Sequence, residues 1–213
     1  MPYSSPARFL SDNELLNYSK EHLRYEIWMF LSSGSELSRI RFSESDSTAI
    51  FYKNALVESF ANHLRNLLLF LYPYSAKDDD VISDYFFVDP IADWKRKRPT
   101  ESATLRNARE RASREISHLT VLRRDGNDES KVWQVTELME EIRTVLKVFV
   151  ENASSTKLDR SVLDVLSTPL NTPSESIVIY FPPMPASLTL AGEGLPNATN
   201  APTAVSSGGS YPR

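Results

Sequence analysis

The segment from residue 47 to residue 72 constrains the fold of this chain more than any other. Its apolar residues return every three or four positions over about seven turns, which is the spacing of one face of an α-helix. The stripe consists of Val57, Phe60, Ala61, Leu64, Leu68 and Leu71. Residues 67–71 are apolar on nearly every side, so we expect this end to be the most buried part of the fold. Pro73 ends the helix because its ring removes a backbone donor and blocks the next turn.

Three other long segments have the same helical spacing. The first begins at Ser11, which forms a capping-box pattern with Glu14, and is expected to end near residues 32–34. The others are expected near residues 100–122 and 131–152, with short helical segments near 81–87 and 159–166. The strand-like run at residues 176–181 is too isolated to build a sheet. The sequence therefore predicts an all-α fold, a four- to five-helix up-down bundle.

Composition changes sharply after residue 167. From Thr168 onward, prolines interrupt a stretch rich in serine, threonine, alanine and glycine, which offers little apolar surface to bury. We therefore expect a helical-bundle domain at residues 1–167 and a largely disordered tail at residues 168–213. The apolar run at 176–181 is expected either to dock on the bundle or to act as a short binding motif.

Several classes of site are disfavoured by composition. The chain has no cysteine, so disulfides, thiolate metal sites and a cysteine nucleophile are excluded. It has six glycines and no glycine-rich phosphate loop, and its aspartates at 78–80 and 84 have no metal-loop spacing. We therefore expect no metal and no cofactor. With no signal-like leader and no long apolar run, we expect a cytoplasmic protein that does not enter a membrane.

The net charge of −4 hides a strong asymmetry. Residues 95–124 carry ten basic and three acidic side chains, so this segment is positive while the rest of the chain is negative. Clustering of this kind is typical of a face that binds a polyanion such as RNA. The side chains expected to contact the RNA backbone are Lys95, Arg96, Lys97, Arg98 and Arg114. The alternative interpretation is a solvated face that balances the acidic segments.

Within this basic segment, Arg111 and His118 stand seven residues apart, which places them near one line of a helix. A fixed cation beside a group that gains or loses a proton near neutral pH is suited to handling a phosphate. We therefore select Arg111 and His118 as candidate catalytic residues. Arg114 lies between them in the sequence and is a candidate to position the phosphate.

A second candidate group lies on the helix at 47–72, where His63, Arg65 and Asn66 follow one another closely. His63 stands one turn from Phe60 and Leu67, which favours a buried, hydrogen-bonded histidine. The functional alternative places His63, Arg65 and Asn66 near His118 as auxiliary site residues. The spacing does not choose between the two.

These residues resemble a known family. Arg111, six intervening residues and His118 match the pattern of an arginine, four to six residues and a histidine found in the HEPN superfamily. The runs Asn-His-Leu-Arg-Asn-Leu-Leu-Leu-Phe-Leu-Tyr at 62–72 and Ile-Ser-His-Leu-Thr at 116–120 are similar to bacterial HEPN-like helical-bundle proteins. The resemblance covers about residues 10–155.

The resemblance implies an RNA-binding protein and a metal-independent endoribonuclease of toxin or phage-defence type. It also implies a homodimer in which the arginine and histidine of two protomers meet. His118 would then act as general acid or base, and Arg111 would stabilise charge on the scissile phosphate. The alternative is a non-catalytic helical interaction module, a dimer or an antitoxin-like partner that binds another protein.

Overall fold

The computed structural model describes residues 10–39, 46–74, 77–89, 93–116, 133–169 and 178–179, with the backbone alone at 115–116 and 178–179. Contacts along the backbone divide the chain into one compact unit, Met1–Pro182, and a second, Pro183–Arg213. All described residues belong to the first unit. The predicted boundary at residue 167 and the predicted disorder of the tail remain predictions.

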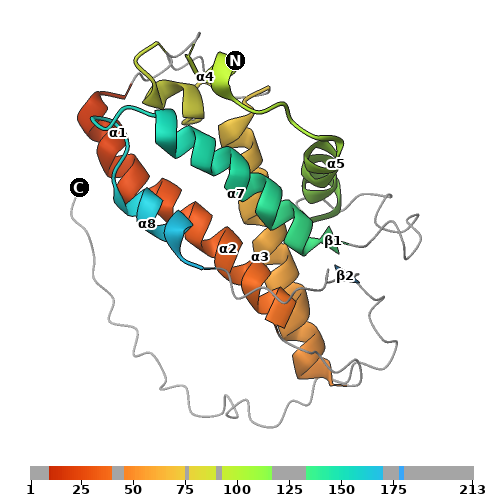
Figure 1. The fold of residues 1–213 in the computed structure, drawn as a ribbon. Coiled ribbons are helices and arrows are strands. Elements are labelled where there is room, and N and C mark those ends of the chain that lie inside the picture. Colours follow the sequence, from red (N-terminus) through yellow and green to blue (C-terminus); the bar gives the residue numbers. More distant parts are fainter. Residues whose placement is uncertain are drawn as a thin grey trace, which may run out of the picture. The chain divides into compact units, whose positions relative to one another are not determined.

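The described chain is mostly helical, which confirms the all-α prediction (Figure 1). The helices are α1 (Asp12–Tyr18), α2 (Arg24–Arg39), α3 (Ser47–Leu71), α4 (Asp93–Lys97), α5 (Ala103–Arg111), α7 (Val135–Asn152) and α8 (Ser161–Ser167). Two π-helical turns, η1 (Ser19–Leu23) and η3 (Ala112–Ile116), and a 3-10 turn, η2 (Ser83–Phe86), complete the helical segments. The two-residue strands are β1 (Trp133–Gln134) and β2 (Val178–Ile179).

The N-terminal helix begins as the sequence predicts and ends later than predicted. Ser11 and Glu14 form the capping box, in which the Ser11 amide donates to the Glu14 carboxylate at 2.9 Å. The helix then continues through η1 and α2 to Arg39, so the predicted end at residues 32–34 is wrong. Gly34 lies within α2, where α7 packs tightly on it: an added Cβ would overlap Sδ of Met139 on α7.

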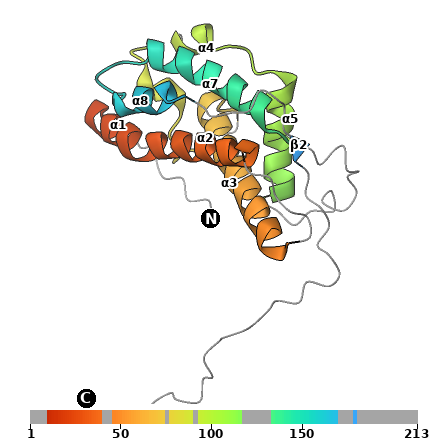
Figure 2. The same cartoon turned by 60° about the horizontal axis from the view of Figure 1, so that its bottom comes forward.

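The core is formed where α2, α3 and α7 pack together (Figure 2). Phe30 of α2 stacks on Phe60 of α3 with ring centroids 4.9 Å apart, and both side chains are fully buried. Leu67, Leu68, Phe70 and Leu71 are buried as well, which confirms the prediction for that end of α3. Asp46 caps α3 by accepting a hydrogen bond from the Thr48 amide, and the helix ends at Leu71, before Pro73.

Phe149 on α7 organises the end of the bundle at which α3 terminates. Its ring lies 5.2 Å from that of Phe70, 5.7 Å from Phe86, 5.9 Å from Phe87 and 5.6 Å from Trp94, centroid to centroid. These aromatic contacts add to the burial of large apolar surfaces. They hold η2 and α4 against α3 and α7, and α4 lies outside the helical segments that the sequence predicted.

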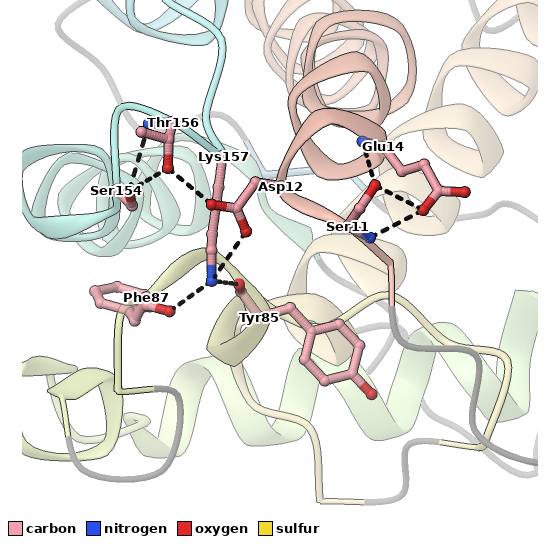
Figure 3. A network of polar contacts seen from close by, with 8 residues as sticks. All are labelled: Ser11, Asp12, Glu14, Tyr85, Phe87, Ser154, Thr156 and Lys157. Carbon is pink, nitrogen blue, oxygen red and sulfur yellow. Dashed lines mark hydrogen bonds and ion pairs between the residues drawn. The ribbon is translucent and has the colours of Figure 1, made fainter.

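Polar contacts join the start of α1 to two later segments (Figure 3). The Lys157 ammonium donates to the carbonyls of Tyr85 at 3.1 Å and Phe87 at 2.9 Å. It also lies 3.7 Å from Asp12, whose other oxygen accepts from the Thr156 hydroxyl at 3.1 Å. One lysine therefore ties the end of η2 and the loop before α8 to the first turn of α1.

Strand β2 is not isolated as the sequence suggested. It pairs antiparallel with β1, with Trp133 opposite Ile179 and Gln134 opposite Val178. The run predicted at 176–181 therefore contributes a two-residue ladder beside the start of α7. Among the described helices, none is long and apolar enough to cross a membrane.

The packing at Gly34 generates a test of the core. We expect Gly34→Val to lower the free energy of unfolding by about 1–3 kcal/mol, because a side chain at this position forces Met139 and Phe60 apart. Urea denaturation followed by circular dichroism measures the change. Ser35→Val introduces the same side chain one position later on α2 and serves as control. Equal losses for the two variants would show that the α2–α7 contact is not tight.

Candidate functional site

Three arginines, one from α3 and two from the continuous segment α5–η3, line one hollow of about 460 Å³. Arg65 comes from α3, Arg109 from α5 and Arg114 from η3. The complete lining is Arg65, Asn66, Leu69, Lys77, Asp80, Arg109, Glu110, Ser113 and Arg114. Four cationic and two anionic side chains therefore surround the space, which leaves it positive. This convergence defines the arginine hollow.

The sequence of α5 explains why its arginines face this hollow. Leu105, Ala108 and Ala112 are buried and form the stripe that packs on the bundle. Side chains one position further along fall beside that stripe, so Arg109 and Ser113 face the flank of α3. There the Arg65 Nε donates to the Ser113 hydroxyl at 3.2 Å, which joins the two helices at the hollow.

Arg109 is held in place by a buried carboxylate. Its guanidinium lies 3.3 Å from Glu101, whose side chain is 1% exposed, and 5.0 Å from the ring centroid of Tyr74. Burial raises the pKa of Glu101, and the guanidinium groups of Arg109, Arg106 and Arg98 oppose that shift. The arginine is therefore fixed between an ion-pair partner and an aromatic face before any ligand arrives.

Arg111, the predicted catalytic arginine, lies elsewhere. Its guanidinium carbon is 4.4 Å from the ring centroid of Trp133, a cation–π contact with a side chain that is 1% exposed. Arg111 does not line the arginine hollow, whereas Arg114 does. His118 lies outside the described residues, so its geometry relative to Arg111 remains a prediction.

The predicted RNA-binding run at 95–98 divides into two parts. Lys95, Arg96 and Lys97 are exposed on α4, where Arg96 pairs with Asp93 at 3.1 Å. Arg98 turns inward instead: it donates to the Leu71 carbonyl at 2.7 Å and lies 4.8 Å from the Tyr72 ring centroid. Burial raises the pKa of Tyr72 to about 12. Arg98 therefore closes the end of α3, whereas the other three side chains are exposed on α4.

His63 is buried and hydrogen-bonded, as the structural interpretation of the sequence expected. Its Nδ1 lies 2.7 Å from Glu26 Oε2 on α2, and the same oxygen accepts from the Asn66 amide at 3.2 Å. Arg65 points to α5 rather than to this group. The three predicted auxiliary residues therefore do not form one group. His63 and Asn66 bind Glu26 on α2, whereas Arg65 binds Ser113 next to α5.

A second, smaller hollow of about 260 Å³ adjoins the first. Asn66, Leu69 and Asp80 line both spaces. Tyr18 and Glu26 line the second hollow but not the first. Burial, together with the carboxylates of Glu26 and Asp80, raises the pKa of the Tyr18 phenol. The described residues contain no cluster of three carboxylates or histidines arranged to hold a metal ion.

Sequence reasoning missed Arg109, Lys77 and Glu26 as members of these spaces. Arg109 carries a weak signal, because it follows the buried Ala108 by one position and so falls beside the apolar stripe of this helix. Nothing near Glu26 in the sequence indicates its partner, which is 37 positions away on α3. No protein-family model, curated protein or solved structure matches this chain significantly.

The Glu26 carboxylate generates a test of the site. We expect Glu26→Ala to lower the free energy of unfolding by about 1–3 kcal/mol, because it removes the acceptor for His63 and Asn66. The combined Glu26→Ala/His63→Ala variant should lose less than the sum of the single variants, since both remove one interaction. Thermal unfolding measures all three.

The matched control is Glu58→Ala, an exposed glutamate on α3, with an expected change below about 0.5 kcal/mol. Additive losses for Glu26→Ala and His63→Ala would contradict a shared interaction.

Proposed function

We propose that this chain is an RNA-binding protein of HEPN-like type that cleaves RNA without a metal ion. The observation that carries the proposal is the arginine hollow, in which Arg65, Arg109 and Arg114 converge on one space. Guanidinium groups bind phosphate through paired N–H donors, and several of them suit a phosphodiester in a nucleic acid.

The arginine hollow has the properties that a phosphate site needs. Arg109 is held by Glu101 and Tyr74, so it loses little side-chain freedom on binding. Arg65 is positioned by Ser113, and Arg114 is exposed at the same space. The exposed Lys95, Arg96 and Lys97 on α4 add further cationic charge that attracts the RNA backbone.

For the cleavage step we propose His118 as the proton-transfer group. In the sequence it follows Arg114 by four residues, the spacing of one helical turn. His118 takes the proton of the ribose 2′-hydroxyl, whose oxygen then bonds to phosphorus while the bond to the 5′-oxygen breaks. The departing 5′-oxygen takes a proton from water, His118 releases its proton to solvent, and the other product ends in a cyclic 2′,3′-phosphate.

Arg111 does not line the arginine hollow, so the proposal gives its charge-stabilising role to other arginines. We propose that Arg65 and Arg114 stabilise the negative charge that builds on the phosphate, the role that the family resemblance gives to Arg111. Arg111 is a positioning residue whose stack on Trp133 holds the junction of α5 and η3. A homodimer joined near this junction is part of the proposal, since family members pair their sites there.

RNA binding gives the first test. We expect Arg65→Gln and Arg114→Gln each to weaken binding of RNA and to flatten the slope of log affinity against log salt by about one. Filter binding over a salt series measures both quantities. Arg39→Gln is the matched control, because Arg39 is exposed on α2, pairs with Glu36 and does not line the hollow. The same loss in all three variants would show that binding is diffuse.

Cleavage gives the second test. We expect RNA cleavage to persist in EDTA, to yield cyclic 2′,3′-phosphate ends and to disappear in His118→Ala. Arg114→Ala should lower kcat by about 10²–10³-fold, as for loss of one charge-stabilising donor, and Arg111→Ala by less. A larger loss in Arg111→Ala than in Arg114→Ala would return the catalytic role to Arg111. Binding without cleavage would identify a non-catalytic RNA-binding module.

A further inference from the structure

Helix α2 presents two large aromatic side chains to solvent. Tyr25 is 50% exposed and Trp28 is 52% exposed, and their ring centroids lie 6.3 Å apart. They line a surface hollow with Glu21 and Arg24. Exposed rings of this size leave apolar surface in water that a flat ligand can cover. We name Tyr25 and Trp28 the aromatic pair.

The aromatic pair rests on buried groups. The Tyr25 ring meets the His63 ring edge-on, with centroids 5.7 Å apart and planes at 81°. His63 in turn is held by Glu26 at 2.7 Å. Tyr25 is therefore supported from beneath by a buried, hydrogen-bonded ring, and a ligand that stacks here pays little to order the protein side of the contact.

A continuous line of contacts joins the aromatic pair to the arginine hollow. Glu26, which holds His63, also binds Asn66 at 3.2 Å, and Asn66 lines both hollows. Arg65 and Arg114 line the arginine hollow together with Asn66. Aromatic faces at one end and phosphate-binding cations at the other are the two components with which proteins bind single-stranded nucleic acid.

We propose that the aromatic pair is a stacking platform for unpaired bases, so that the chain selects single-stranded over double-stranded RNA. This inference rests on the RNA binding proposed above and adds the substrate class. In a duplex the base faces are covered by neighbouring base pairs, whereas a single strand can turn its bases onto aromatic side chains. Arg24 beside the pair supplies a cation for the adjoining phosphate.

The tryptophans make this inference directly measurable. Trp94 and Trp133 are 0% and 1% exposed, so Trp28 is the one tryptophan of the three that a ligand in solution reaches. We expect a short oligoadenylate to quench the intrinsic fluorescence of the full chain. Duplex RNA of the same length should quench far less. Heparin, a polyanion without bases, should compete for binding without quenching.

The variants separate stacking from charge. Trp28→Ala should weaken binding of the oligoadenylate at least about fivefold and leave the binding of heparin unchanged, because one stacked base contributes about 1–3 kcal/mol. Phe51→Ala is the matched control: Phe51 is 67% exposed on α3, 12 residues and about 18 Å along the helix axis from His63. It should change neither. Melting temperatures of both variants check that the fold is intact.

Each outcome has a distinct meaning. Salt-dependent binding of the oligoadenylate without quenching, or with equal affinity in Trp28→Ala, overturns the stacking platform and leaves the proposed function standing. Absence of binding to any RNA overturns both. If quenching instead follows protein concentration and Trp28→Ala abolishes self-association, the aromatic pair is an interface between copies of the chain and the inference is wrong.

Discussion

The packing of four aromatic rings around Phe149 is the interaction on which the rest of this structure depends. It joins the end of α3 to η2 and α4, two short segments. A five-residue helix such as α4 is far below the length at which an isolated helix is stable in water. The buried Trp94 therefore fixes α4, and with it the exposed Lys95 and Lys97, to the bundle.

The same cluster determines where the hollows form. Residues 77–82 precede η2, so anchoring Phe86 on Phe149 holds this stretch along the flank of α3. Lys77 and Asp80 thereby reach the arginine hollow, and the Asp80 carboxylate accepts from the Lys77 amide at 2.8 Å. The segment that this apolar contact anchors thus contributes one cationic and one anionic side chain to the lining of the arginine hollow.

The sequence predicts the long helices well because their signals are local. Ser11 and Asp46 mark helix starts through hydrogen bonds made within a few residues, and Pro73 marks a helix end because it lacks a backbone donor. The stripe of α3 is readable from spacing alone. The sequence did not predict the features that depend on contacts with residues far away in the chain. Gly34 was expected to end a helix, but Met139, about a hundred positions later, fills the space that its missing side chain leaves.

The candidate site shows the same division. Spacing selected Arg114 and Arg65 separately, but their meeting at one hollow depends on how α5 packs on α3. Arg111 and Arg114 are equally basic in the sequence, and only the position of Trp133 shows that Arg111 stacks on a buried ring. Charge patterns selected the segment, and the packing assigns different surroundings to its individual arginines.

The π-helical turn η1 has a consequence for how α1 and α2 present their side chains. Tyr18 and Glu26 are eight residues apart, so in an uninterrupted α-helix they would point about 80° away from each other. A π turn accommodates one extra residue, which reduces the difference to about 20° and brings both onto one face. Both line the second hollow. A single added residue in one helical turn thus rotates every later side chain of the helix about the helix axis. Here it places the Tyr18 phenol and the Glu26 carboxylate on one face, whereas a regular helix would separate them.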